Sequence, residues 1–170
     1  MTGGFPVSSD MEGLRVHASP ELIASYAPAL YRFVARLVGQ DADAEDVLQQ
    51  TFAAAIGNLG RFQGSAEKLR SWVFTIAYRA SMDVLRGRRR VVPLDEIEIE
   101  APEEPIDLET PRAELKRAFE KLAPGDQQIL TLKYQDGFDN GEVAKILAIT
   151  TTHAGVLLYR AKQNLRKALK

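Results

Sequence analysis

Cations and hydroxyl groups repeat along one side of a predicted helix between Lys68 and Arg86. At about 100° per residue, six side chains fall on this side: Lys68, Ser71, Thr75, Arg79, Met82 and Arg86. Three further arginines follow, at Arg88, Arg89 and Arg90. A polyanion can lie along such a row, although a solvated face that ends in positive charge also suits the negative end of a helix dipole. We call residues 68–86 of this row the basic stripe.

The other side of the same helix is apolar, as a helix that faces a core requires. It carries Trp72, Val73, Ile76, Ala77, Ala80 and Val84. The preceding loop, residues 63–67, is small and polar and suits a close approach to a nucleic-acid strand. The spacing therefore predicts a loop and an amphipathic helix that hold the basic stripe in place.

A group of four carboxylates marks the predicted start of an earlier helix, at Asp41, Asp43, Glu45 and Asp46. Negative charge at a helix start is favourable by itself. The periodicity predicts a buried face on this helix formed by Leu48, Thr51, Phe52, Ala55 and Leu59. An acidic, amide-bearing strip of small profile then faces outward, at Asp46, Gln49, Gln50 and Ala53. Such a strip suits a basic partner helix, so helix capping and partner docking are both open explanations.

The last sixty residues predict four further helices. After a helix over 112–122, Pro124 begins a second one that stops at Asp136-Gly137. Asp139 with Glu142 three residues on is a capping-box pattern, and Thr150 caps a final helix that is basic on one side. Two helices joined by a short turn, the second one basic, indicate a helix-turn-helix that places the start of its second helix in the major groove.

Charge and composition divide the 170 residues into segments. Residues 1–90 hold 11 Lys+Arg against 9 Asp+Glu, residues 91–111 hold 0 against 8, and residues 112–170 hold 11 against 6. With Pro93, Pro102 and Pro105, the acidic stretch predicts an extended linker that cannot fold alone. We therefore expect a flexible leader over 1–19, helical domains over 20–90 and 112–170, and a linker over 91–111.

Several function classes find no support in the composition. The chain has no cysteine and only two distant histidines, so we expect no disulfide and no metal site. No apolar run reaches membrane-spanning length, and the first twenty residues lack the apolar centre of a signal peptide, so we expect a cytoplasmic protein without membrane insertion.

Residues 61–86 resemble the second conserved region of bacterial sigma-70 family sigma factors of the extracytoplasmic-function (ECF) type. The matching positions are Arg61, Phe62, Gly64, Leu69, Arg70, Trp72, Phe74, Ile76, Ala77, Asp83, Leu85 and Arg86. The acidic segment from Asp43 to Phe52 is similar to the family motif D-A-E-D-L-V-Q-E-T-F in all but three positions. Such a run over one loop and two helices is far more specific than a short motif.

The second half resembles the fourth conserved region of the same family. Its matches include Leu122, Leu130, Leu132, Tyr134, Gly137, Glu142, Ala144, Leu147, Ile149, Leu158, Arg160 and Ala161. Both resemblances occur in the family's order with a linker between them. They imply an all-α fold of two small helical domains, a region 2-like bundle and a region 4-like helix-turn-helix.

The resemblance implies a sigma factor that binds core RNA polymerase, recognises promoter DNA and promotes strand opening, without enzymatic activity or a cofactor. It also implies an anti-sigma factor or another regulator as a partner. The implied polymerase-binding residues are Asp43, Glu45, Asp46, Gln49, Gln50 and Ala53. The implied residues for the downstream promoter element are Arg61, Gln63, Gly64, Ser65, Lys68, Arg70, Ser71, Trp72, Thr75, Arg79, Arg86, Arg88, Arg89 and Arg90. Those of the helix-turn-helix are Thr150, Thr151, Thr152, His153, Tyr159, Arg160 and Lys162.

Four positions depart from the family pattern. Ala148 replaces a turn glycine, at a cost of about 1 kcal/mol if the position needs a positive φ. Gly155 and Leu157 replace the usual Lys and Arg of the recognition helix, and Arg79 replaces an Asn. A sigma mimic that binds an anti-sigma protein and leaves promoters alone is therefore the alternative.

Overall fold

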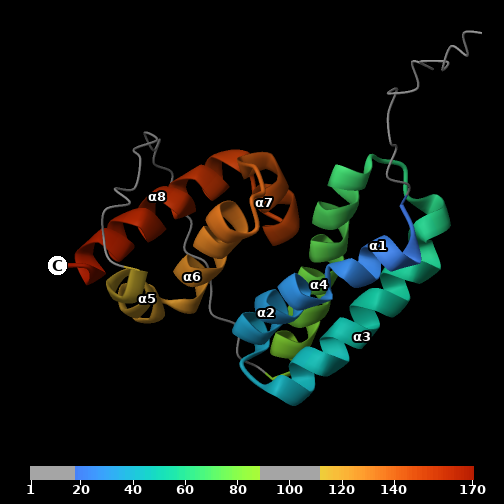
Figure 1. Ribbon diagram of the computed structural model, residues 1–170, viewed down its shortest axis with the longest axis horizontal. Helices are drawn as coiled ribbons and strands as arrows, with labels where there is room; N and C mark the ends of the chain where they lie inside the picture. The colour runs from blue at the N-terminus through green and yellow to red at the C-terminus, as the bar shows by residue number, and fades with distance from the viewer. Residues whose placement is uncertain (1–17, 89–111) are drawn as a thin grey trace, which may run out of the picture.

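A computed structural model describes residues 18–88 and 112–170, and every regular element in these two ranges is helical. The helices form two groups that lie side by side, α1–α4 and α5–α8 (Figure 1). The all-α prediction is confirmed for the described residues. Residues 1–17 of the predicted leader (1–19), the predicted linker over 91–111, and Arg89 and Arg90 lie outside them.

The first domain begins with two short helices, α1 (Pro20–Ser25) and α2 (Ala27–Val38). The Ser19 side chain caps α1 by accepting a hydrogen bond of 3.1 Å from the Leu22 backbone N–H. Tyr26 separates the two helices because Pro28 lies in the first turn of α2, where proline is tolerated. The segment is thus divided just before Pro28, and Gly39 ends α2 with a φ of 70°.

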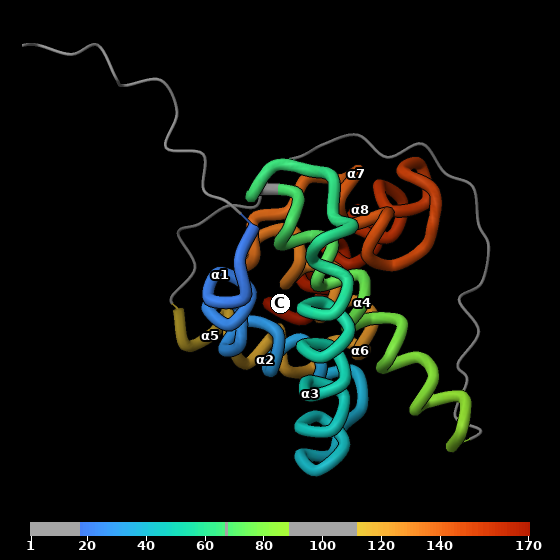
Figure 2. Tube along the Cα trace, turned by 90° about the vertical axis from the view of Figure 1, so that its right-hand side faces the viewer, coloured from blue at the N-terminus to red at the C-terminus, as the bar shows by residue number. Residues whose placement is uncertain are grey.

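Two long helices complete the first domain, α3 (Asp41–Asn58) and α4 (Ala66–Gly87). A single 3-10 turn, η1 (Leu59–Arg61), and a short loop join them. α3 lies along one side of the bundle and faces the viewer in Figure 2. Its buried face is shifted from the predicted one: Ala44, Val47, Thr51 and Ala55 are buried, whereas Leu48, Phe52 and Leu59 are half-buried.

The second domain contains α5 (Arg112–Glu120), α6 (Pro124–Leu130), α7 (Asn140–Leu147) and α8 (Thr151–Ala168). A π-helical turn, η2 (Thr131–Gln135), extends α6. The predicted capping box at the start of α7 is present: the Asp139 side chain accepts from the Glu142 N–H, and the Glu142 carboxylate accepts from the Asp139 N–H. Thr150 caps α8, so the predicted helix-turn-helix is formed by α7 and α8.

The turn between α7 and α8 uses Ala148 in the left-handed conformation, with φ 56° and ψ 41°. An L-residue pays roughly 1–2 kcal/mol for this conformation, and glycine avoids that cost. Position 148 does need a positive φ, so the replacement of the family's glycine by Ala148 carries the predicted energetic cost.

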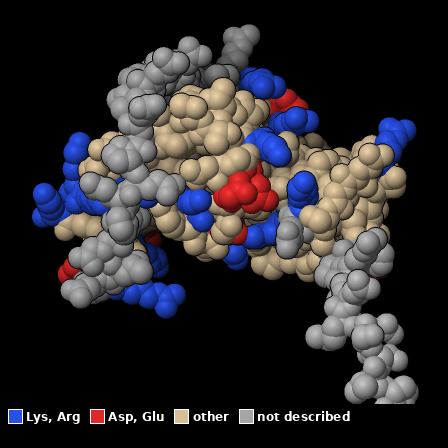
Figure 3. Space-filling model, turned by 90° about the horizontal axis from the view of Figure 1, so that it is seen from above, with Lys and Arg blue, Asp and Glu red and all other residues tan. Residues whose placement is uncertain are grey.

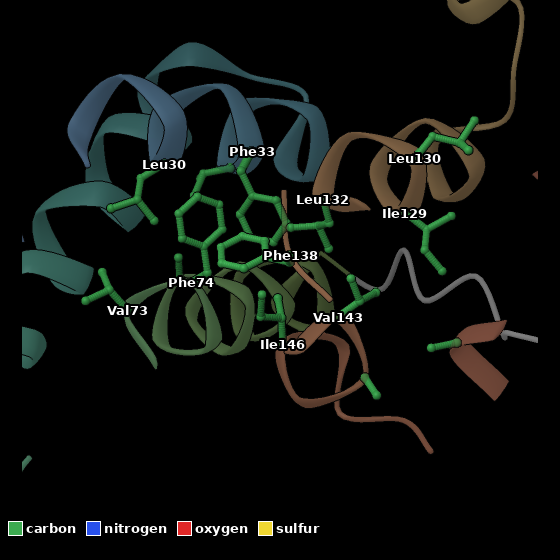
Figure 4. Packing of buried hydrophobic residues seen from close by; sticks show 14 of the residues in the cluster. Leu30, Phe33, Val73, Phe74, Ile129, Leu130, Leu132, Phe138, Val143 and Ile146 are labelled. Carbon is green, nitrogen blue, oxygen red and sulfur yellow. The ribbon is translucent and has the colours of Figure 1, made fainter. Parts of the chain in front are cut away.

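Aromatic rings join the cores of the two domains. The ring of Phe74 on α4 lies 5.1 Å from that of Phe33 on α2, and 5.0 Å from that of Phe138, which precedes α7 (Figure 4). All three side chains are buried. α7 packs along α4, and α6 packs against α2, so the first domain is covered on one side by the second.

Candidate polymerase and nucleic-acid interfaces

The acidic strip on α3 faces outward. All four strip residues, Asp46, Gln49, Gln50 and Ala53, are exposed, and so is Glu45, the fifth of the six residues predicted to bind polymerase. Asp43 is the exception, because it forms an ion pair with Arg88 at the end of α4. The Arg88 guanidinium also donates a hydrogen bond of 2.9 Å to the Val38 carbonyl. Both of these predicted site residues therefore make contacts within the first domain.

An open cavity lies between the loop before α4 and the helices α3 and α4. Its volume is about 530 Å³, and it is lined by Ala54, Asn58, Arg61, Phe62, Gln63, Trp72 and Ile76. The rings of Phe62 and Trp72 lie 5.0 Å apart and form its aromatic wall. A Cβ atom at Gly64 would approach the Phe62 ring to 2.7 Å, so only glycine fits there with the ring in this position. Polar groups at the rim and aromatic rings behind them suit an unstacked base.

The C-terminal half of the basic stripe is open. Arg79 and Arg86 are exposed, and the Arg86 guanidinium lies 2.8 Å from the Asp83 carboxylate on the same helix. An exposed pair of this kind contributes little energy and can exchange for another anion. These two arginines can therefore meet a nucleic-acid backbone as the chain stands.

The N-terminal half of the stripe meets the second domain instead. The Arg70 guanidinium donates to the Asp136 carbonyl and lies 3.3 Å from its carboxylate. Ser71, predicted to be exposed, is buried at 8% exposure, and its hydroxyl donates to the Lys68 carbonyl. Thr75 is half-buried and donates to the Ser71 carbonyl. The expectation of one continuous open stripe was wrong, because α7 packs on this part of α4.

A cleft of about 650 Å³ separates Lys68 and the start of α4 from α7. One wall carries Lys68 and Arg70, and the other carries Asp139, Glu142 and Lys145. Viewed from above, a small acidic patch lies near the middle of the molecule with basic side chains on either side (Figure 3). A phosphate that approached Lys68 would thus face two carboxylates across the cleft.

Arginines surround the buried carboxylate of Asp136. Burial raises its pKa above the ordinary value, while Arg70, Arg32 and Arg36 each act to lower it. Arg36 donates a hydrogen bond of 2.7 Å to the Thr131 hydroxyl across the domain boundary. Burial lowers the pKa of the Arg36 guanidinium. Desolvation is the largest influence on Asp136, so burying this charge cancels much of what the ion pair gains.

The predicted helix-turn-helix residues lie around the start of α8. Thr150, Thr151 and Thr152 are exposed, and the Thr150 hydroxyl accepts 3.1 Å from the His153 N–H. Further along, Arg160 is exposed, His153 and Tyr159 are half-buried, and the Lys162 ammonium lies 5.4 Å from the centre of the Tyr134 ring. The exposed side chains at the start of α8 are therefore small and carry hydroxyl groups. The cations Arg160 and Lys162 lie more than two turns further along the helix.

Sequence reasoning missed the residues whose role depends on distant partners. Asn58 and Phe62 line the cavity, and Arg36, Thr131 and Asp136 join the domains. Phe62 belonged to a matched motif and could have been identified from it. The others had no local signal, because Asp136 stands in an ordinary helix-stop pattern and Arg36 on an ordinary amphipathic helix.

The described ranges hold neither a metal site nor a membrane-spanning helix. Within residues 18–88 and 112–170, no group of three or more His, Cys, Asp or Glu side chains is arranged to hold a metal ion. Among the helices described, none is both long and apolar enough to cross a membrane.

Family models match both halves of the chain. Residues 22–91 match Sigma-70 region 2, and residues 112–165 match Sigma-70, region 4. The RNA polymerase sigma factor CarQ of Myxococcus xanthus is 30% identical over 156 residues, which cover 89% of each chain. The ECF RNA polymerase sigma factor BldN of Streptomyces coelicolor is 28% identical over 155 residues, which cover 87% of this chain and 59% of BldN.

Solved structures show the same fold. The sigma factor RpoE, crystallised with the anti-sigma factor NepR from Bartonella quintana, superposes with a TM-score of 0.63 at 24% identity, over 88% of this chain and 94% of RpoE. At that identity the likeness concerns the fold. The sequence resemblance to CarQ carries the family assignment.

Proposed function

The chain belongs to the sigma-70 family, as a sigma factor of the ECF type, and we propose that it binds core RNA polymerase, recognises promoter DNA and promotes strand opening. Sigma factors are initiation factors and not enzymes. The chain would act by binding alone, with the first domain carrying most of the contacts.

Core polymerase would bind the outer face of α3. The exposed strip offers carboxylates at Glu45 and Asp46, amides at Gln49 and Gln50, and a small side chain at Ala53 that lets a partner helix come close. Charge-assisted bonds to a basic partner helix are stronger than neutral ones. Asp43, which the sequence also assigned to this interface, would support it through its ion pair with Arg88.

The downstream promoter element would lie along α4 and the preceding loop. Lys68, Arg79 and Arg86 would hold the backbone, and the cavity beside Trp72 would capture a base flipped from the non-template strand. Stacking of about 1–3 kcal/mol per base on aromatic side chains offsets an unstacking cost of a few kcal/mol. Arg61, Gln63 and Ser65 are exposed beside the cavity and would contact the same strand.

The helix-turn-helix would meet the upstream element mainly through its hydroxyl groups. Thr151 and Thr152 lie in the first turn of α8, and its N-terminal backbone attracts phosphate. Gly155 and Leu157 bring no charge, so we expect few base-specific contacts here. By analogy with RpoE, an anti-sigma factor would be the regulator.

The cavity is the observation that carries this proposal, and Trp72 allows a direct test. It is the chain's single tryptophan and lies in the cavity wall, so a base that enters should quench its fluorescence. With core polymerase, we expect run-off transcripts from a subset of genomic fragments and quenching by the matching non-template oligonucleotide.

A matched pair of variants makes the test specific. Gln63→Ala alters the cavity rim, whereas Gln135→Ala removes the same side chain from an exposed position in the second domain. The first should reduce quenching and transcript yield, and the second should leave both unchanged. Absence of transcripts from every fragment in the presence of core polymerase would contradict the proposed function.

A further inference from the structure

We infer that the chain carries a further docking surface at the end of the second domain that bears the C-terminus, and that its occupant is an acidic protein segment with an apolar side chain among its carboxylates. A pocket of about 380 Å³ lies there between the α5–α6 turn and the last turns of α8, which are side by side (Figure 1). We call it the end pocket. None of the residues that line it belongs to the surfaces assigned to polymerase or promoter DNA, so the inference goes beyond the proposed function.

The rim of the end pocket is basic. Lys121, which follows α5, and Lys167 of α8 both line it and are exposed. Arg117 lies one turn before Lys121, and Lys170 follows Lys167 by three residues; both are exposed as well. The end of a helix favours a cation by itself. Here the ends of two helices meet at one pocket, so their cations can face the same bound group.

The remaining lining is largely apolar and low in profile. Leu122, Ala123 and Ala168 line the end pocket between the two lysines. Ala123, Pro124 and Gly125 are exposed where α6 begins, so a partner backbone can come close without meeting a long side chain. An apolar side chain of moderate size therefore fits between Lys121 and Lys167, and carboxylates on either side of it can reach them.

The carboxylate that lines the end pocket already has a partner. The Asn164 amide donates a hydrogen bond of 2.7 Å to the Asp126 carboxylate. On α5, the Glu120 carboxylate lies 3.9 Å from the Lys116 ammonium. An anion placed beside Asp126 would be repelled, whereas an anion at the rim meets lysines. The charges therefore favour a ligand whose carboxylates stay at the rim while its apolar part lies against the lining.

Nucleic acid fits this surface less well than protein does. The start of α8 is predicted to enter the major groove, and Lys167 lies roughly 22 Å further along the helix than Thr152. A duplex bound at the start of α8 would thus leave the end pocket accessible. A second duplex would offer phosphates to the lysines but no apolar side chain to Leu122 and Ala168. The end pocket can therefore hold a protein partner while the chain is bound to promoter DNA.

Binding of defined peptides to the full-length chain tests the inference. The test ligand is a fluorescein-labelled peptide of twelve residues made of Glu and Leu, followed by anisotropy. Two matched peptides carry Gln in place of Glu, or Ser in place of Leu. We expect the Glu/Leu peptide to bind most tightly, because it alone uses both the rim and the lining, and we expect added salt to weaken it.

Lys167→Glu tests the rim. It should weaken binding of the Glu/Leu peptide by about fivefold at low salt, as the loss of an exposed ion pair does. Lys145→Glu makes the same charge change at an exposed position on α7 outside the end pocket, and it should change the affinity little.

Ala123→Phe tests the apolar lining without a change of charge. Its ring should fill the end pocket, so binding of the Glu/Leu peptide should weaken while that of the Glu/Ser peptide should not. Ala113→Phe adds the same ring at an exposed position on α5 that does not line the end pocket, and it should leave both affinities unchanged. Circular dichroism confirms that the variants keep their helix content.

The inference is overturned if Lys167→Glu and Lys145→Glu weaken binding equally, or if Ala123→Phe binds the Glu/Leu peptide as the wild type does. It is also overturned if Lys167→Glu weakens the binding of duplex DNA as much as that of the peptide. Binding that appears only after the eight carboxylates of residues 91–111 are replaced by amides would contradict it as well, because the occupant would then be the chain's own acidic segment. Failure of run-off transcription would count against the proposed function alone, since the peptide measurement uses neither polymerase nor promoter.

Discussion

The first domain presents its predicted partner-binding side chains on unstrained helices, whereas the second domain combines a strained turn with a recognition helix that carries no Lys or Arg over residues 151–159. Gly39 ends α2 with a φ of 70°, and Ala148 ends α7 with a φ of 56°. The α3 strip is exposed, while Asp136 and α7 of the second domain cover the start of α4. On the proposed function, the first domain would therefore supply most of the contacts to polymerase and DNA.

Asp46→Arg should have the largest effect on binding to core polymerase. If it had no effect, the contrast between the two domains would lose its support. Reversing a charge at the centre of the exposed strip should weaken association with core polymerase by at least about tenfold, or ~1.4 kcal/mol. Helix content by circular dichroism should not change. Asp41→Arg makes the same charge change in the first turn of α3 outside the strip, and it should leave core binding close to that of the wild type.

An equal loss with both variants would contradict the docking proposal, since it would show a general effect of charge. Pull-down with core polymerase at two salt concentrations distinguishes the cases. Undiminished binding by Asp46→Arg would mean that the carboxylates only stabilise the start of α3.

Arg79→Ala and Lys68→Ala should have a smaller effect that differs between the free chain and the holoenzyme. Each lost phosphate contact lowers the slope of log affinity against log salt by about 0.9 on duplex or 0.7 on single-stranded DNA. Arg79 is open, so its slope change should appear in both states. Lys68 faces Asp139 and Glu142, so its change should appear mainly in the holoenzyme.

A salt titration of DNA binding by each variant, as the free chain and as the holoenzyme, measures these four slopes. The same slope change for Lys68→Ala in both states would mean that the second domain does not mask this residue. Unchanged slopes for both variants in both states would leave the basic stripe as a solvated face.

Local features of the fold were predictable from the sequence. The spacing of Asp139 and Glu142 indicated a capping box, and the departure at Ala148 indicated the turn that needs a positive φ. Each of these depends on residues within one turn of a helix. Short-range chemistry of this kind is visible in a single sequence.

Contacts between the domains were not predictable in the same way. Periodicity assigned Ser71 to the exposed side of α4, and it is buried because α7 packs there. Arg70 and Asp136 are 66 residues apart, and nothing in the sequence near either one specifies the other. The acidic strip on α3 is exposed as expected, but its binding role and that of the basic stripe remain predictions.

Ala148→Gly should have the smallest effect and would sharpen the comparison of the two helix ends. Glycine removes the left-handed penalty of roughly 1–2 kcal/mol but adds backbone entropy to the unfolded chain, so we expect a net stabilisation of about 0.5–1 kcal/mol. Ala113→Gly, at an exposed helical position in α5, should destabilise by a similar amount because it incurs only the entropic cost. Urea unfolding of the full chain measures both. If Ala148→Gly lowered the free energy of unfolding as its control does, the left-handed conformation of Ala148 would carry no cost. The ends of α2 and α7 would then not differ in strain. A stabilised variant with unchanged core binding would confine the strain to the second domain.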